Sequence, residues 1–256
     1  MKMKNIVYNS GQIKKYYSMS RQCWDDFYPS ERRVFEKVSE AHALGDLLDI
    51  GCACGGLGKA LHDRFGINSY TGIEINQDAV CWAKKNLDIG SPSFLICGDF
   101  LKIKLKKKFD TVVSLSCADW NIQTEKIVNR AWKSVRPGGY FVISLRTTPG
   151  KGVNNIKKSY QYIDFFGEEN TPEIANYVVF NFKDSLMMFR DLSPRPELIG
   201  VYGYWGKPSS TSVTPFKELV FAVFYIKKYE RVASRERTRL ELNLPLEVLA
   251  DVTKKG

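Results

Sequence analysis

The stretch LLDIGCACGGLGKAL, residues 47–61, is the part of this chain that is most informative about its fold. It begins as an apolar run, passes through Asp49, places four glycines within residues 51–58 and continues in a pattern typical of a helix. A buried strand that turns tightly into a helix is the first unit of a parallel sheet with crossover helices. Glycines in such a turn let the backbone approach a ligand, and the N–H groups at the start of the helix are free to bind it.

The chain after this turn alternates apolar runs with segments of helical length. This alternation predicts an α/β fold: a Rossmann-like, doubly wound, seven-stranded and mostly parallel sheet. Two late strand-like runs, ELIGVYGYWG and KELVFAVFYIKK, are expected to complete the sheet as a C-terminal antiparallel hairpin. The five earlier strands are predicted at residues 46–51, 69–75, 93–98, 109–116 and 139–146, with helices at 57–65, 77–88 and 123–135, the last ended by RPGG.

Composition and charge limit the possible functions. The chain has 256 residues, 44% of them hydrophobic, which is enough for one large domain. The net charge of +10 permits a nucleic acid, an anionic surface or a negatively charged substrate as partner, but the densest basic run, residues 102–110, lies between two predicted strands and is expected to be a solvated loop. Two histidines and no paired CxxC units make a metal site unexpected.

The amino-terminal sequence bears on location. No apolar run reaches the roughly 18 residues that a membrane span requires, and the first residues lack the continuous apolar stretch of a secretory signal. We therefore expect a cytoplasmic protein with no membrane span.

Acidic residues follow each of the first three predicted strands. Asp49 closes the first, Glu74 the second and Asp99 follows the third. A carboxylate after the second strand can accept hydrogen bonds from the hydroxyls of a ribose. The acid after the third strand can accept a hydrogen bond from the amine of an adenine, with Phe100 and Ile75 packed against the adenine ring. Asp49 is equally well interpreted as an acid that orients the turn through backbone N–H groups.

These motifs together resemble the class I S-adenosylmethionine-dependent methyltransferases over roughly residues 40–146. LDIGCACG resembles the family's first-strand motif, GIEIN its ribose motif, GDF its adenine motif, and FDTVVSLS with VRPGGYFVIS its fourth and fifth strands. Ala53 stands where a second glycine is usual. The cysteines of CAC are then small residues in a tight turn. The resemblance implies S-adenosylmethionine as cofactor and a cofactor-binding set of Asp49, Gly51, Cys52, Ala53, Gly55, Glu74, Ile75, Asp99, Phe100 and Ser116.

An NAD-binding site is the main alternative for a glycine-rich turn followed by an acid. GCACGGLG does not have the GxGxxG spacing of that fold, and RPGGYFVIS has no counterpart in its fingerprint. The motifs therefore favour S-adenosylmethionine over NAD as the ligand.

The methyl acceptor is less defined by sequence. The fourth strand ends in SLSCADWN, where Asp119 is the candidate general base, with helix capping as its alternative. Methyl transfer from a sulfonium also proceeds by positioning alone. The NPPY-like motif of amino-group nucleic-acid methyltransferases is absent, and Cys117 lacks the preceding proline of cytosine-C5 enzymes. We expect a small-molecule or saccharide acceptor, methylated at oxygen, with Tyr28, Trp120, Arg146 and Tyr160 as candidate substrate residues.

The expected organisation is an N-terminal helical lid, a methyltransferase domain and an extension. The lid covers residues 1–45 and the domain residues 46–230, with 147–181 as a substrate-side insertion and 231–256 as the C-terminal extension. The tail pattern from residue 203 also resembles bacterial methyltransferases of surface-polysaccharide synthesis. An RNA methyltransferase that uses its basic surface remains the alternative, which retention on a polyanion column with a salt slope would favour.

Overall fold

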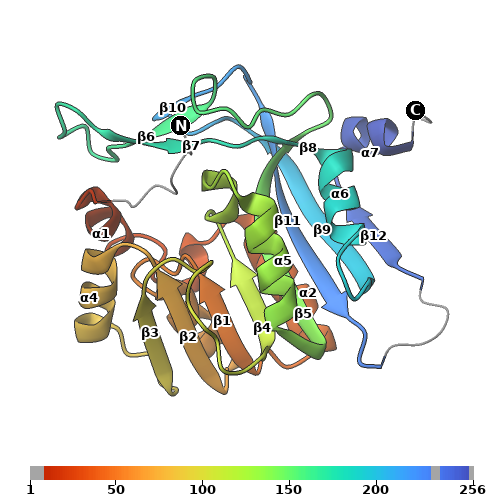
Figure 1. Ribbon diagram of the computed structural model, residues 1–256, viewed down its shortest axis with the longest axis horizontal. Helices are drawn as coiled ribbons and strands as arrows, with labels where there is room; N and C mark the ends of the chain where they lie inside the picture. The colour runs from red at the N-terminus through yellow and green to blue at the C-terminus, as the bar shows by residue number, and fades with distance from the viewer. Residues whose placement is uncertain (1–8, 232–236, 254–256) are drawn as a thin grey trace.

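The computed structural model describes residues 9–231 and 237–253, and in it one large sheet runs through the molecule (Figure 1). Its strand order is β12-β9-β11-β5-β4-β1-β2-β3, and β8 pairs with β5. Strands β1 to β5 are parallel, whereas β11 runs antiparallel between β5 and β9. The strands are β1 (Asp46–Ile50), β2 (Ser69–Glu74), β3 (Ser93–Cys97), β4 (Phe109–Ser114), β5 (Val135–Thr148), β8 (Phe180–Asn181), β9 (Pro196–Gly206), β11 (Leu219–Lys228) and β12 (Arg239–Asn243).

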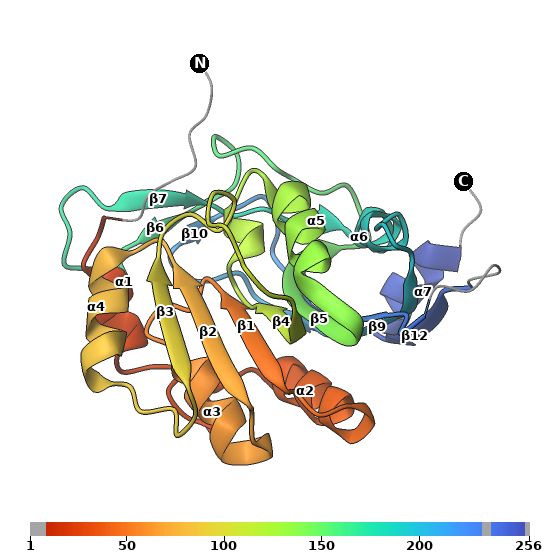
Figure 2. The same ribbon diagram turned by 60° about the horizontal axis from the view of Figure 1, so that its bottom comes forward.

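Helices cover both faces of this sheet, which confirms the doubly wound architecture (Figure 2). On one face α2 (Pro29–Ala41) and α3 (Gly56–Phe65) bury side chains such as Phe35 and Leu61. On the other face α5 (Thr124–Ser134) and α6 (Phe182–Arg190) bury Trp132 and Phe189. Two further helices lie at the ends of the sheet: α4 (Gln77–Asn86) against β3 and β2, and α7 (Leu246–Thr253) against α6.

The sheet is wider than the seven strands expected from sequence. The seven predicted strands are present, β9 and β11 among them as the antiparallel hairpin, and β8 and β12 are added to them. β12 lies in the segment expected as a C-terminal extension and pairs parallel with β9. The strand was missed because none of its five residues is buried, so it has no buried apolar face that a sequence pattern could show. Residues 232–236 and 254–256 of that segment lie outside the described residues.

The RPGG sequence belongs to β5 and not to a turn before it. Helix α5 ends at Ser134, and Val135 already pairs with Phe109 of β4. The register then shifts, so that Tyr140 pairs with Thr111. Gly139 permits this bulge because a Cβ there would lie 2.4 Å from the carbonyl oxygen of Asp110.

The segment expected as an insertion contains short strands. β6 (Tyr160–Ile163) pairs with β7 (Glu173–Asn176) and with β10 (Ser212–Val213), which lies in the connection between β9 and β11. This small sheet lies across the carboxyl ends of the parallel strands (Figures 1 and 2). Strands of two to four residues are too short to produce a recognisable period in sequence.

The N-terminal segment is attached to that insertion. Helix α1 (Gln12–Tyr17) precedes two single turns of 3-10 helix, η1 (Trp24–Asp26) and, much later in the chain, η2 (Ala118–Trp120). The Ser10 hydroxyl donates to Glu169 at 2.6 Å, and the backbone N–H groups of Asn9 and Ser10 donate to Glu173. The rings of Tyr16 and Phe165 lie 4.6 Å apart. The first eight residues of the expected lid lie outside the described residues.

None of the described helices is long and apolar enough to cross a membrane.

A close helix–strand contact beneath the glycine-rich turn positions one of the acids. Gly58 of α3 faces the ring of Tyr70 in β2, and a Cβ at Gly58 would lie 2.5 Å from that ring. The Tyr70 hydroxyl in turn donates to Asp49 at 2.8 Å. The absence of a side chain at Gly58 therefore sets where Tyr70, and through it Asp49, can lie.

We expect Gly58→Val to lower the free energy of unfolding by about 1–3 kcal/mol, because the added atoms overlap a fully buried ring. Urea denaturation measures the change. Lys59→Val, at the neighbouring half-exposed position, is the control and should change stability by less than about 0.5 kcal/mol. Equal stability of the Gly58 variant and the wild type would contradict the proposed contact.

Candidate functional site

A cavity of about 180 Å³ lies at the carboxyl ends of β1, β2 and β4, and we call it cavity 1. Ten residues were predicted from sequence to bind the cofactor, and the structure brings nine of them into its lining. The exception is Gly55, which is the N-cap of α3 and has a φ of +80°. The nine are Asp49, Gly51, Cys52, Ala53, Glu74, Ile75, Asp99, Phe100 and Ser116.

The glycine-rich turn keeps its backbone close to the cavity. Gly51 has a φ of +76°, and a Cβ there would lie 2.4 Å from the Cys117 sulfur. Ala53 has a φ of +48°, a left-handed conformation that costs a residue with a Cβ about 1–2 kcal/mol. Ala53 thus adopts a backbone conformation that glycine adopts more readily, and the turn keeps its shape although alanine replaces the usual glycine.

Glu74 connects this turn to the end of β2. Its Oε2 accepts the backbone N–H of Ala53 at 2.9 Å, and its Oε1 accepts those of Ile75 and Asn76 at 2.8 Å each. Burial raises the pKa of Glu74, and these three hydrogen bonds oppose that rise. A carboxylate offers about four acceptor positions. About one therefore remains for a ligand in cavity 1.

Asp49 is the second buried acid of cavity 1. Burial raises its pKa to about 7, although the hydrogen bond from Tyr70 acts in the opposite direction. Its Oδ2 is held by the protein, and the residue also lines the cavity. Asp49 therefore serves the packing beneath the turn and also contributes a carboxylate to the cavity surface.

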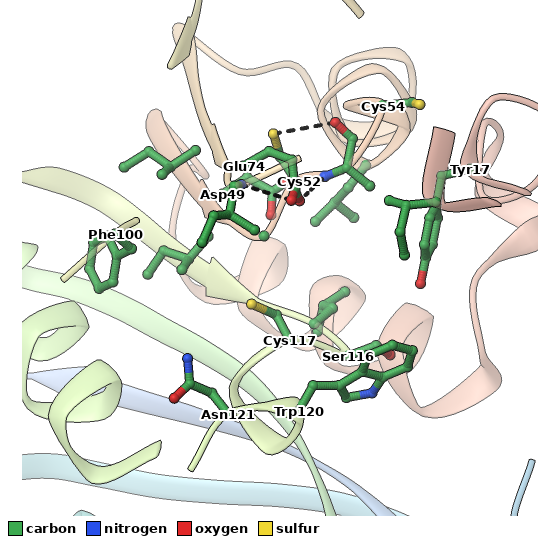
Figure 3. A pocket seen from close by; sticks show the side chains of 18 of the residues that line it. Tyr17, Asp49, Cys52, Cys54, Glu74, Phe100, Ser116, Cys117, Trp120 and Asn121 are labelled. Carbon is green, nitrogen blue, oxygen red and sulfur yellow. Dashed lines mark hydrogen bonds between the residues drawn. The ribbon is translucent and has the colours of Figure 1, made fainter. Parts of the chain in front are cut away.

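Aromatic side chains line cavity 1 on two sides. Figure 3 shows the Phe100 ring at one end of the view and the rings of Tyr17 and Trp120 toward the other, with Glu74 and Asp49 between them. Phe100 is buried against the hydrophobic core and has the Arg130 guanidinium 5.1 Å from its ring centre. Asp99 accepts the backbone N–H of Leu101 at 2.9 Å.

A second cavity, of about 500 Å³, adjoins cavity 1, and we call it cavity 2. The two cavities share Tyr17, Arg21, Ser116 and Trp120 in their linings. Cavity 2 is bounded by the N-terminal segment, by β6 and Tyr177 of the insertion, and by the β9–β10 connection. Its volume lies within the range of about 300–1,000 Å³ that small-molecule sites occupy.

Asp119 of η2 lies in the lining of cavity 2 as a buried ion pair. Its Oδ2 accepts from Arg146 Nε at 2.6 Å and from the Arg146 backbone N–H at 3.2 Å, while Arg146 Nη2 donates to the Asp119 carbonyl at 2.7 Å. The Arg146 guanidinium lies 3.8 Å from the centre of the Tyr177 ring. Oδ1 of Asp119 is buried with no partner in the described structure. The role of Asp119 as a base stays a prediction.

Three of the four predicted substrate residues line cavity 2: Tyr28, Trp120 and Arg146. Tyr160 lines neither cavity. Side chains alternate along β6, and Gln161 is the residue of that strand in the lining of cavity 2. Tyr160 therefore lies on the opposite face of β6, where its hydroxyl pairs with that of Tyr162 at 3.3 Å.

Sequence reasoning missed several lining residues. The N-terminal segment contributes Tyr17, Arg21 and Gln22, and the insertion contributes Ile156 and Asn176. The density of aromatic residues at positions 16–28 is a signal in sequence for Tyr17. Arg21 and Asn176 had no signal in sequence, because both reach the site through long-range contacts of irregular or short elements.

Comparison with known proteins shows what the central part of this chain is similar to. Residues 48–143 match the family described as a methyltransferase domain. The malonyl-[acyl-carrier protein] O-methyltransferase of Acetivibrio thermocellus is 29% identical over 137 residues, 52% of this chain and 48% of that protein. Phosphoethanolamine N-methyltransferase 2 of Caenorhabditis elegans is 26% identical over 155 residues, 58% of this chain and 35% of that protein. The chain thus spans between a third and a half of the length of these relatives.

A solved S-adenosylmethionine-dependent methyltransferase from Clostridium acetobutylicum has the same fold. Its TM-score is 0.52 at 16% identity, over 77% of this chain and 89% of that one. Residues 48–143 thus match a methyltransferase domain, and the chain has the fold of a solved S-adenosylmethionine-dependent methyltransferase, as the sequence motifs predicted. S-adenosylmethionine is the cofactor of this class.

Asp49→Asn should change how stability depends on pH. The folded-state pKa of about 7 exceeds the unfolded value of about 3.9, so the unfolded chain binds fewer protons between them. The contribution of Asp49 to stability is full below about pH 4 and is lost as the pH rises through 7. Relative to the wild type, Asp49→Asn gains up to about 1.4 kcal/mol per pH unit in that window.

Urea denaturation at several pH values measures this difference. Asp63→Asn, at a half-exposed surface position, is the control and should follow the wild type at every pH. A constant difference between the Asp49 variant and the wild type across the window would show that Asp49 is ionised throughout.

Proposed function

We propose that this protein transfers the methyl group of S-adenosylmethionine to an oxygen atom of a small molecule bound in cavity 2. The observation that carries the proposal is the pair of adjoining cavities, one with the cofactor motifs and one with the buried Asp119. The residues of cavity 1 suit the cofactor, because Glu74 keeps about one acceptor position for a ribose hydroxyl and the left-handed backbone of Gly51 and Ala53 keeps the turn in the cavity lining.

The cofactor supplies a methyl group on a positively charged sulfur, which is already activated for displacement. The protein then has to bind the acceptor, exclude water and receive a proton. In this proposal Asp119 Oδ1 accepts the proton of the acceptor hydroxyl as the new carbon–oxygen bond forms. Arg146 holds Oδ2 with two hydrogen bonds and so fixes the direction in which Oδ1 points. Tyr177 packs against the guanidinium and keeps Arg146 in place.

The lining of cavity 2 supports a polar acceptor with apolar ring faces, such as a saccharide. The rings of Tyr28, Phe221 and Tyr204 form one wall, with centres 6.4 and 6.0 Å apart. A polar cluster provides hydrogen-bonding groups, since Gln161 Nε2 donates to Ser209 at 3.1 Å and to Thr211 at 3.0 Å. The O-methyltransferases among the relatives support oxygen as the accepting atom. Salt-dependent retention on a polyanion column would instead favour the RNA methyltransferase.

We expect Glu74→Ala to weaken S-adenosylmethionine binding at least tenfold. The variant loses an acceptor worth about 1.5–3 kcal/mol and the three backbone hydrogen bonds that shape the turn. Isothermal titration calorimetry measures the affinity, and circular dichroism checks that the variant folds. Unchanged affinity in a folded variant would remove Glu74 from the cofactor site.

Asp119→Asn should lower turnover about 100-fold or more while S-adenosylmethionine affinity stays within about twofold, because the amide cannot accept the proton. The residual rate should rise with pH, as hydroxide replaces the missing base. Asp191→Asn, which changes an exposed ion-paired aspartate, is the matched control. Full activity of the Asp119 variant on an identified acceptor would show that positioning alone carries the reaction.

A further inference from the structure

The charges that line cavity 1 are unequal. Three carboxylates contribute to the lining: Asp49, Glu74 and Asp99. Within the described part of the chain, Arg21 is the one cationic side chain in that lining. S-adenosylmethionine has a sulfonium and an ammonium group, which suit the acids, and also a carboxylate, which does not. The carboxylate of the cofactor therefore needs a partner, and the charges of the lining leave one candidate.

Arg21 is held by one edge of its guanidinium. Its Nη2 donates to both carboxylate oxygens of Glu31 at 3.0 Å each, and Glu31 is itself almost completely buried. The guanidinium lies 4.5 Å from the centre of the Phe27 ring, and 15% of the Arg21 side chain is exposed. A guanidinium has five N–H donors. Nε and Nη1 of Arg21, with three of them, have no hydrogen-bond partner among the described residues, and Arg21 lines both cavities.

The position of Arg21 along cavity 1 matches the methionine end of the cofactor. Its backbone lies on the first turn of α3, where a Cβ on Gly56 would be 2.0 Å from the Arg21 carbonyl oxygen. Tyr17, which lines the same cavity near the N-terminal segment, lies in Figure 3 on the side opposite Phe100, the candidate adenine residue. The first turn of a helix adds N–H groups that favour an anion.

We propose that Arg21 binds the carboxylate of S-adenosylmethionine through Nε and Nη1, with Glu31 as the residue that positions its guanidinium. This assignment rests on the proposed function, because it requires the cofactor in cavity 1. Arg21 precedes the glycine-rich turn by thirty residues and belongs to the N-terminal segment. Binding of the carboxylate therefore connects the cofactor to the segment that also walls cavity 2.

Two ligands that differ at the methionine end test the assignment. S-adenosylhomocysteine has the carboxylate and the amine, whereas 5′-methylthioadenosine keeps the adenine, ribose and thioether and lacks both. We expect Arg21→Ala to weaken S-adenosylhomocysteine binding at least tenfold and to change 5′-methylthioadenosine binding by less than twofold, measured by calorimetry. Arg21→Lys keeps the charge beside Glu31 but loses the forked donors, and it should weaken S-adenosylhomocysteine binding about threefold or more. This second variant keeps the test valid if the alanine variant does not fold.

Arg32→Ala is the matched control, since Arg32 lies on the same segment, pairs with Asp25 and lines neither cavity. It should leave both affinities unchanged. Equal losses for the two ligands in the Arg21 variants would overturn the proposal and make Arg21 a residue that only holds the segment. Unchanged S-adenosylhomocysteine affinity would overturn it in favour of a role in cavity 2. Failure of the wild type to bind either ligand would instead reject cavity 1 as the cofactor site.

Discussion

The site depends on one buried carboxylate that joins two neighbouring strands. Glu74, at the end of β2, accepts the backbone N–H of Ala53 in the turn after β1 and two N–H groups of its own following loop. A charged group this deep in the protein is tolerated only when hydrogen bonds replace its lost water. The turn therefore cannot move away from β2 without breaking the hydrogen bond that Glu74 Oε2 accepts from Ala53. This constraint fixes the turn that lines cavity 1, the proposed cofactor site.

The strained backbone around the turn follows from the same requirement. Ala53 takes a left-handed conformation so that its N–H points toward Glu74, and Gly51 passes so close to Cys117 that no Cβ fits between them. Residues in such conformations persist when the surrounding structure determines them more strongly than their own preferences. Here the hydrogen bond to Glu74 holds the conformation of Ala53, and close packing against Cys117 holds that of Gly51.

Cavity 2 is built from parts that are distant in sequence. The N-terminal segment, the insertion and the β9–β10 connection meet above the sheet edge. Hydrogen bonds from Asn9 and Ser10 to Glu169 and Glu173 join the N-terminal segment to the insertion. Two buried ion pairs, Arg21 with Glu31 and Arg146 with Asp119, lie in its walls. Each pair leaves polar atoms unused, which is the arrangement expected where a ligand completes the hydrogen bonding.

The central sheet and most of cavity 1 could be predicted from the amino-acid sequence, because strand periodicity, a glycine-rich turn and acids at three strand ends are local signals that parallel pairing brings to one edge. Nine of the ten residues predicted on these signals line cavity 1. Tertiary packing was needed to show that Tyr160 turns away from cavity 2 while Gln161 faces it, since four-residue strands have no readable alternation. Packing also brings Arg21 and Asn176 to cavity 1. Contacts between residues more than 20 positions apart depend on how the elements assemble, so no periodic sequence pattern predicts them.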